Sequence, residues 1–128
     1  VDNVQYRLLK ATTPGSYTFI LEGTKELPRR LMHPKRKTIG LRVPAHPVAL
    51  ALLEVLNEPL LTTTLLLPGD EEPMTEGWEI RDRMDGEVDL ILDGGHCGIL
   101  PTTVVDLTSS SPELIRAGRG ALEPFGFE

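Results

Sequence analysis

Threonine hydroxyls at the start of apolar stretches are the groups in this sequence whose chemistry is easiest to interpret. Thr62-Thr63-Thr64 opens one such stretch and Pro101-Thr102-Thr103 opens another. Successive side chains of an extended chain alternate between faces, so Thr62 and Thr64 would share one face and Thr63 the other. Hydroxyls in this arrangement can bind a phosphate, a ribose or a small polar ligand. The same residues also fit a strand without a ligand, because threonine has a high strand propensity.

The adjacent residues His96 and Cys97 do not predict a nucleophile pair. Such a pair must converge, whereas immediate neighbours on an extended chain point apart. Asp93 and His96 could supply two metal ligands, but no further ligand stands at a matching spacing. His46 precedes a predicted helix and is expected to cap it or to lie on the surface. We therefore predict no catalytic residue and no metal site, and both glycine-rich nucleotide-binding patterns are absent.

Charge is distributed unevenly along the chain. The formal net charge is −6, yet residues 1–46 carry nine Lys or Arg and only three Asp or Glu. The candidate RNA-binding residues lie in one basic cluster: Lys25, Arg29, Arg30, Lys35, Arg36 and Lys37, with Arg42 just beyond. Such a cluster can neutralise phosphates and release counterions, although a solvated loop and helix face would look the same. Aromatic residues make up only 5 % of the chain, which favours contact with a duplex backbone over stacking on single strands.

Length and composition indicate one ordinary globular domain. The chain has 128 residues, of which 40 % are hydrophobic and 25 % charged. No apolar run approaches the ~20 residues that a membrane span needs, and no secretory leader is visible. A single Cys excludes an internal disulfide framework. We expect a cytoplasmic protein with no membrane partner.

Hydrophobic periodicity and turn residues predict an α/β fold. Helices are expected over 2–10, 26–31, 47–56 and 76–84, with Thr75 capping the last. Strands are expected over 17–21, 38–43, 60–67, 88–92, 102–107 and 113–116. Helices and strands alternate in the first part of the chain, and strands follow one another in the last part, which indicates a mixed sheet. Arg42 and Arg116 then fall at strand ends, where ligands of such sheets usually bind.

The sequence resembles the YrdC/YciO family. The resemblance lies in six segments: PGSYT at 14–18, KTIGLRVP at 37–44, HP at 46–47 with the leucine-rich helix after it, PLLTTT at 59–64, TTVVDLT at 102–108 and IRAG at 115–118. It implies a twisted mixed sheet with flanking helices and a basic concave face, in a single domain over residues 1–128. Family members carry further residues upstream, including a Lys-x-Arg element for the ATP phosphates. Because this chain begins with Val1, we expect it to be the C-terminal part of the fold.

The resemblance also implies substrates and partners. Catalytic members make threonylcarbamoyl-AMP from ATP, L-threonine and bicarbonate, with release of pyrophosphate. The product feeds the threonylcarbamoyladenosine modification of tRNA, and members bind double-stranded RNA or tRNA on the basic face. ATP would be a substrate, Mg²⁺ would accompany the nucleotide, and no metal would be bound by the protein itself.

The family motifs assign roles to six residues. By resemblance, Thr38, Thr64 and Arg116 would bind ATP, and Arg42, Thr62 and Thr102 would bind threonine. Arg42 would hold the carboxylate through paired hydrogen bonds and Arg116 would stabilise phosphate charge. No protein nucleophile is needed, because the threonine nitrogen attacks bicarbonate and the carbamate attacks the α-phosphate. Positioning and electrostatics would supply the catalysis.

Two departures from the synthase pattern leave the function open. Leu66 and Pro68 stand where the synthase branch has an Asn and a Ser that help to hold the nucleotide, and this matches the YciO branch. One interpretation is a synthase-type enzyme. The alternative is a double-stranded RNA or tRNA-binding module with reduced or lost synthase activity, and a third is an unrelated small-molecule role. The oligomeric state is open, because sheet edges without upstream partners invite pairing with another chain.

Overall fold

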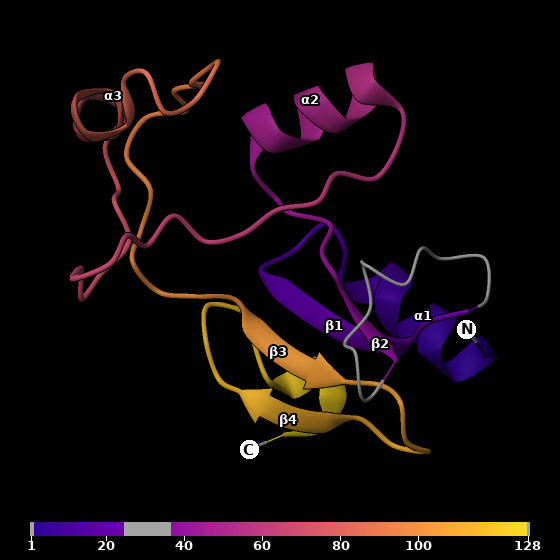
Figure 1. The fold of residues 1–128 in the computed structure, drawn as a ribbon. Helices are drawn as coiled ribbons and strands as arrows, with labels where there is room; N and C mark the ends of the chain where they lie inside the picture. Colours follow the sequence, from indigo (N-terminus) through magenta and orange to yellow (C-terminus); the bar gives the residue numbers. More distant parts are fainter. Residues whose placement is uncertain (1, 25–36, 128) are drawn as a thin grey trace. The chain divides into compact units, whose positions relative to one another are not determined.

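The computed structural model describes residues 2–24 and 37–127 (Figure 1). They form two compact units, one made of Val1–Leu50 with Pro101–Glu128 and the other of Ala51–Leu100. The predicted helix at 26–31 lies outside the described residues. So do five members of the basic cluster: Lys25, Arg29, Arg30, Lys35 and Arg36.

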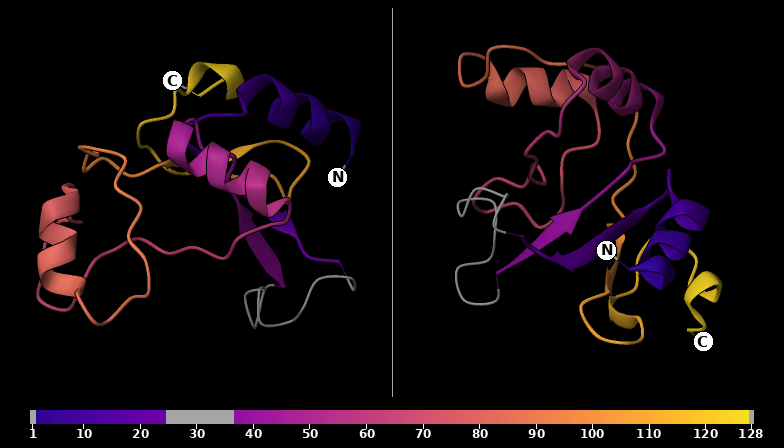
Figure 2. Two further views of the ribbon diagram at one scale, coloured as in Figure 1. Left: turned by 90° about the horizontal axis from the view of Figure 1, so that it is seen from above. Right: turned by 90° about the vertical axis from the view of Figure 1, so that its right-hand side faces the viewer.

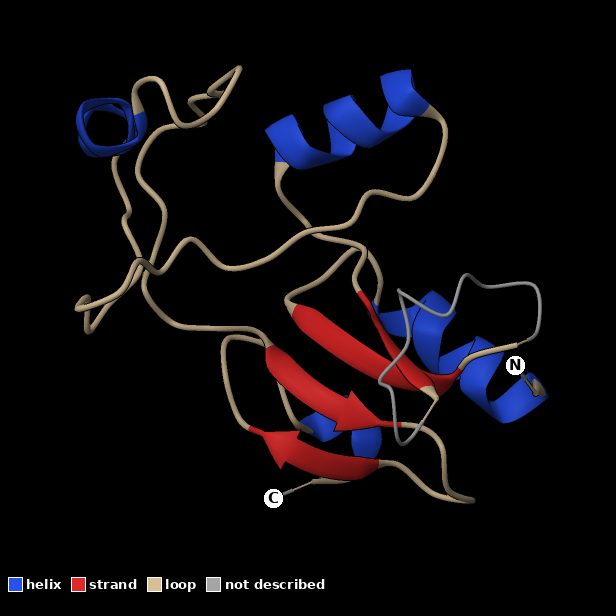
Figure 3. Cartoon of the chain, viewed as in Figure 1, coloured by secondary structure: helices blue, strands red, loops and turns tan. Residues whose placement is uncertain are grey.

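The first unit is built on a four-stranded mixed sheet with the order β2-β1-β3-β4 (Figure 3). Its strands are β1 (Tyr17–Glu22), β2 (Thr38–Leu41), β3 (Thr103–Asp106) and β4 (Glu113–Arg116). β1 runs antiparallel to β2 and parallel to β3, and β3 runs antiparallel to β4. The predicted α/β class and these four strands are confirmed, with β2 and β3 each two residues shorter than expected and β1 one residue longer.

The helix α1 (Asn3–Thr12) begins at a capping box. Asp2 accepts a hydrogen bond from the Gln5 amide at 2.8 Å, and the Gln5 side chain accepts one from the Asp2 amide at 3.0 Å. This reciprocal arrangement satisfies two amides that the helix itself leaves unpaired. Leu8 and Leu9 then pack against the core. The predicted helix is confirmed and ends two residues later than expected.

The core lies on one face of the sheet. Tyr17, Phe19 and Leu21 alternate with half-buried or exposed residues along β1, and Val105 on β3 is fully buried. α1 and the 3-10 helix η2 (Glu123–Phe125) lie on the same side of the sheet in Figure 2 and pack on this face. Phe125 contacts the Tyr17 ring edge-on, with centroids 5.3 Å apart. The opposite face, which carries Thr18 on β1, is therefore the one free to present polar groups.

The helix α2 (Pro47–Leu56) matches its predicted bounds. The Val48 amide donates to His46 Nδ1 at 3.3 Å, so His46 caps the helix as expected. Asn57 follows with a left-handed φ of 54°, a conformation that suits a helix end. No helix in the described part of the chain is long and apolar enough to cross a membrane.

The second unit contains fewer regular elements than predicted. Its helix α3 (Gly77–Met84) is preceded by Glu76 as the N-cap residue, so the predicted capping by Thr75 is wrong. The Thr75 carbonyl instead accepts a hydrogen bond from the Cys97 amide at 2.9 Å. An ion pair of 2.9 Å joins Arg83 on this helix to Asp70 in the preceding loop.

The strands predicted at 60–67 and 88–92 are wrong. Both segments are apolar enough for strands, but neither pairs with a strand among the described residues. Leu61 is 79 % exposed and Leu90 is 75 % exposed, so neither is buried as a sheet interior requires. The only ladder feature nearby is an isolated bridge between Asp85 and Val88. A short apolar run does not specify a strand when no partner is available.

Burial of Tyr17 predicts a pH dependence of stability. Burial raises the pKa of the Tyr17 phenol, and the charge of Glu123 raises it further. Because the folded pKa lies above the unfolded value, the neutral phenol contributes stability below about pH 10 that is lost as the pH rises through the folded pKa. The free energy of unfolding, measured by urea titration, should therefore fall more steeply above this pH in the wild-type protein than in Tyr17→Phe. Tyr6→Phe is the control, because Tyr6 is 58 % exposed. Identical slopes for the wild type and Tyr17→Phe would contradict this account.

Candidate functional site: an arginine-rich end of the sheet

The strand register brings four polar residues to one end of the sheet. Phe19 pairs with Leu41, so the next position along each strand places Thr18 opposite Arg42. Tyr17 pairs with Thr103, which places Thr102 beside the start of β1. Arg116 pairs with Val104 across the edge of β3. Arg42, Thr102 and Arg116, predicted from three separate motifs, therefore lie near one another.

The hydroxyl of Thr102 is the centre of a hydrogen-bond network. Thr102 is only 6 % exposed, and its Oγ1 lies 2.7 Å from Thr18 Oγ1 on the neighbouring strand. Arg116 donates from Nη2 to the Thr102 carbonyl at 2.9 Å and to its Oγ1 at 3.3 Å, and from Nε to the same carbonyl at 3.2 Å. These bonds fix one side of an exposed guanidinium group, and its remaining N–H donors can serve a ligand.

The loop after β4 is held from beneath by Thr103. This residue is fully buried, its Oγ1 donates to the Gly120 carbonyl at 2.8 Å, and the same atom accepts from the Gly118 amide at 3.0 Å. The Arg119 amide donates to the Pro101 carbonyl at 2.9 Å. A Cβ atom at Gly118 would collide with the carbonyl oxygens of residues 101 and 102, so the approach requires glycine. Both sides of the loop are thus tied to the start of β3.

Positive charge accumulates at this end of the sheet. Burial lowers the pKa of the Arg42 guanidinium, and the charges of Arg119 and Arg116 lower it further. Arg42 nevertheless stays protonated, because the pKa of arginine lies far above neutrality. Within residues 2–24 and 37–127, no carboxylate forms an ion pair with any of these three arginines. The arrangement suits a bound carboxylate or phosphate, which would relieve the repulsion.

Thr38, another predicted ligand residue, lies away from this end of the sheet. Thr38 pairs with Glu22 at the far end of the sheet, on the same face as Arg42 but four residues along β2, which is roughly 13 Å. Thr62 and Thr64 belong to the second unit and are exposed in a segment without regular structure. Lys37 is described and exposed, with a left-handed φ of 53°.

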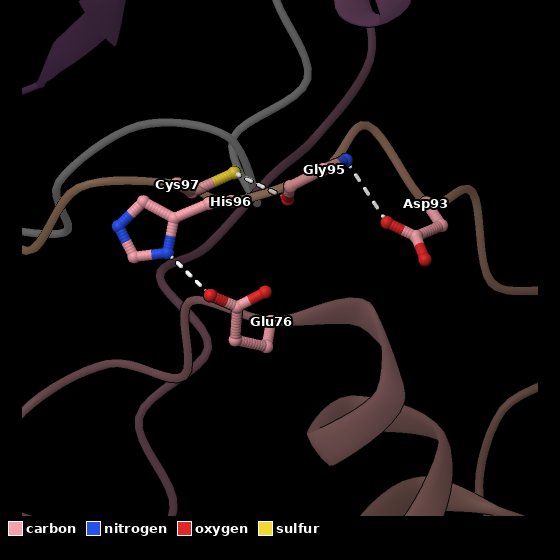
Figure 4. A network of polar contacts seen from close by, with 5 residues as sticks. All are labelled: Glu76, Asp93, Gly95, His96 and Cys97. Carbon is pink, nitrogen blue, oxygen red and sulfur yellow. Dashed lines mark hydrogen bonds and ion pairs between the residues drawn. The ribbon is translucent and has the colours of Figure 1, made fainter.

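The second unit shows how His96 and Cys97 are used (Figure 4). His96 Nδ1 lies 2.5 Å from Glu76 Oε1, whereas Cys97 Sγ approaches the Gly95 carbonyl at 3.8 Å. The two side chains are engaged with different partners, in agreement with the prediction that they do not converge as a nucleophile pair. Asp93 accepts from the Gly95 amide at 2.9 Å instead of joining His96. Among the described residues, no group of three His, Cys, Asp or Glu side chains is placed to hold a metal ion.

Three residues of the site were not predicted from sequence. Thr18 and Arg119 were not predicted to have a role, and the Thr103 hydroxyl, in a run that could bind a ligand, instead holds the loop after β4. The role of Thr18 depends on the pairing of β1 with β3, which brings it to Thr102 more than eighty positions away. The roles of Thr103 and Arg119 depend on the return of the loop after β4 to the start of β3. One signal was present: Arg119 stands between Gly118 and Gly120, and both glycines allow a close backbone approach.

Comparison with known proteins gives a consistent family match. The family model Sua5_yciO_yrdC, described as "Telomere recombination", matches residues 1–118. The "Uncharacterized protein YciO" of Escherichia coli strain K12 is 58 % identical over 125 residues, which cover 98 % of this chain and 61 % of that protein. The crystal structure of E. coli YciO matches over the same shares with a TM-score of 0.88. The chain thus spans about three fifths of the length of this relative.

More distant relatives carry a named activity. The "Threonylcarbamoyl-AMP synthase" of Pyrococcus abyssi is 32 % identical over 117 residues, which cover 91 % of this chain and 34 % of that protein. A crystal structure of P. abyssi Sua5 complexed with L-threonine matches with a TM-score of 0.80 at 28 % identity, covering 92 % of this chain and 34 % of that one.

The buried hydroxyl of Thr103 predicts a specific loss of stability. Thr103→Val keeps the shape of the side chain but leaves the Gly118 amide and the Gly120 carbonyl without this partner. The free energy of unfolding should fall by about 2–6 kcal/mol, since each of the two groups left unsatisfied costs about 1–3 kcal/mol. Thr103→Ser keeps the hydroxyl and should lose about 1 kcal/mol. Urea unfolding of the two variants measures this, and an equal loss in both would show that the hydroxyl does not hold the loop.

Proposed function

The chain belongs to the Sua5/YciO/YrdC family, as the six motif segments predicted, and on that premise we propose that the complete protein forms threonylcarbamoyl-AMP from ATP, L-threonine and bicarbonate. The observation that carries this proposal is the convergence of Arg42, Thr102 and Arg116 at one end of the sheet. The family motifs alone predict all three as substrate-binding residues, Arg116 for ATP and the other two for threonine. Their convergence supports a ligand with at least one anionic group.

The threonine carboxylate is the proposed partner of Arg42. The guanidinium is partly desolvated and faces two further cationic groups, so a carboxylate relieves repulsion as well as making charged hydrogen bonds. Thr102 Oγ1 lies on the same face, where it can contact the amino acid without leaving the Thr18 hydroxyl. The similarity to P. abyssi Sua5, whose structure contains L-threonine, supports this assignment.

The nucleotide is the proposed partner of Arg116. Its backbone-anchored guanidinium can stabilise phosphate charge with its remaining donors. Thr38, on the same face at the far end of β2, would meet another part of an extended nucleotide. Contacts of Thr64 with ATP and of Thr62 with threonine stay predictions, since both residues belong to the second compact unit. Mg²⁺ would enter with the nucleotide.

The proposed chemistry requires positioning more than reactive side chains. The amino nitrogen of threonine attacks the carbon of bicarbonate, whose hydroxyl leaves as water with a proton from the amine, to give a carbamate. A carbamate oxygen then attacks the α-phosphorus of ATP as pyrophosphate leaves. No side chain forms a covalent intermediate. The arginines hold the reactants close together and offset the negative charge of the phosphates, and both effects lower the barrier.

Arg42→Gln tests the enzyme proposal. The variant removes the positive charge that would hold the carboxylate, so the KM for threonine should rise by about ten- to a hundredfold, equivalent to about 1.4–2.8 kcal/mol. The measurement is threonine- and bicarbonate-dependent release of pyrophosphate from ATP by the complete protein. Arg7→Gln on α1, whose helix packs on the other face, is the matched control. Absence of pyrophosphate release from the wild-type protein would reject the synthase activity.

A second candidate function is binding of double-stranded RNA or tRNA. It is favoured by the basic cluster defined above and by Leu66 and Pro68, which replace nucleotide-holding residues of the synthase branch. Cytoplasmic location remains a prediction.

Replacing Lys35, Arg36 and Lys37 together by Ala tests the RNA proposal. If these residues contact phosphates, duplex RNA binding should weaken and its dependence on salt should become less steep by about three units of slope or less. A gel-shift titration at two or more salt concentrations measures both effects. The control replaces Arg7, Lys10 and Arg81, which are also basic but stand outside the cluster. Equal binding by the wild type and the 35–37 variant would exclude this function for the cluster.

A further inference from the structure

Arg119 is an exposed arginine beside the candidate site that neither the motifs nor the proposed reaction uses. It stands three residues after Arg116, in the loop that Thr103 and Pro101 hold against the start of β3. Its own amide donates to the Pro101 carbonyl at 2.9 Å. The backbone of Arg119 is therefore fixed immediately beside Thr102, and not in a free surface loop.

The flanking glycines explain why the loop can sit so close to the sheet. A side chain at Gly118 would meet the backbone of residues 101 and 102, and a side chain at Gly120 would meet the ring of Tyr17. Gly120 is buried, and its carbonyl accepts the Thr103 hydroxyl. Because the residues on either side are held, the position of Arg119 is set by the fold before any ligand arrives.

The charge of Arg119 acts on the site. It lowers the pKa of Arg42, and its effect is larger than that of Arg116. The backbone geometry agrees with this repulsion, because the Arg119 amide bonds to the Pro101 carbonyl and Arg42 lies at the end of the sheet where Thr102 enters β3. In the part of the chain that the structure describes, no carboxylate pairs with Arg119. Three arginines near one end of the sheet favour the binding of an anion that carries charge at more than one centre.

We propose that Arg119 is a third anion-binding residue of this end, which acts with Arg116 to select a ligand with two or more linked anionic groups, the diphosphate portion of a nucleotide or free pyrophosphate, while Arg42 holds the threonine carboxylate. The inference rests on the proposed function, since it takes the polyanion to be the polyphosphate of the nucleotide. Threonine carries a single carboxylate, so its binding does not require the third arginine. Arg119 contributes charge and position and takes no part in bond making.

Calorimetric titration of the complete protein with inorganic pyrophosphate, orthophosphate and L-threonine tests this role. Arg119→Gln should weaken pyrophosphate binding by about five- to tenfold, because one charged contact is lost at a solvent-exposed position. Threonine binding should change less than about twofold, because its single carboxylate is held by Arg42 and the loss of one nearby exposed charge is screened by solvent and salt. Arg119→Lys should recover part of the loss. Arg7→Gln removes the same charge from α1 and should leave pyrophosphate binding unchanged.

The outcomes separate this inference from the proposed enzyme activity. If Arg119→Gln weakens pyrophosphate binding and Arg7→Gln does not, the third-arginine role stands even where the wild-type protein releases no pyrophosphate from ATP. If ATP is turned over but Arg119→Gln matches Arg7→Gln in pyrophosphate binding, the inference is wrong and the enzyme proposal stands. Equal weakening of threonine and pyrophosphate binding by Arg119→Gln would also overturn it, because selectivity for the polyanion would be absent. Urea unfolding of each variant confirms that the compared proteins are equally folded.

Discussion

The parallel pairing of β1 with β3 is the constraint on which the rest of this structure depends. It joins Tyr17 to Thr103 across most of the chain and places the start of each strand at the same end of the sheet. β2 and β4 then pair antiparallel on either side, so their last residues arrive where β1 and β3 begin. Parallel strands need a crossover connection. The intervening residues, with the second compact unit among them, form that connection.

Alternation along the paired strands divides structural from candidate functional residues. Tyr17 and Thr103 face the core with α1 and η2, where an aromatic cluster and a buried hydroxyl stabilise the fold. Thr18 and Thr102 face the other way and join their hydroxyls at 2.7 Å. The two adjacent threonines where β3 begins therefore have different roles. Thr103 holds the loop after β4 in place, and Thr102 binds the Arg116 guanidinium.

At the arginine-rich end of the sheet, like charges repel one another, and a bound anion would reduce this repulsion. Arg42 is partly desolvated and lies near two like charges, which disfavours its charged form without removing its proton. A ligand anion would offset both costs. The Arg116 guanidinium and the Arg119 amide are held in place by hydrogen bonds to the carbonyls of Thr102 and Pro101. Such fixed cations need little reorganisation when an anion arrives.

Local signals predicted most of the first unit. The β-rich run at 17–21, the alternation at 38–43 and the turn residues predicted strands of the sheet, and the motifs predicted Arg42, Thr102 and Arg116 as ligand residues. The sequence did not reveal which strands pair, so the contact of Thr18 with Thr102 and the use of Arg119 could not be foreseen. In the second unit an apolar run at 60–67 was mistaken for a strand, because burial by partner elements decides that outcome and leaves no local mark.

Calorimetric titration of the complete protein with ATP, with and without L-threonine, measures whether the arginine-rich end of the sheet binds both substrates. If the arginine-rich end holds both substrates, each should raise the affinity for the other, because binding free energies are coupled reciprocally. We expect measurable ATP binding that tightens when threonine is present. The absence of binding heat with either ligand, in a protein that is folded and binds duplex RNA, would contradict it.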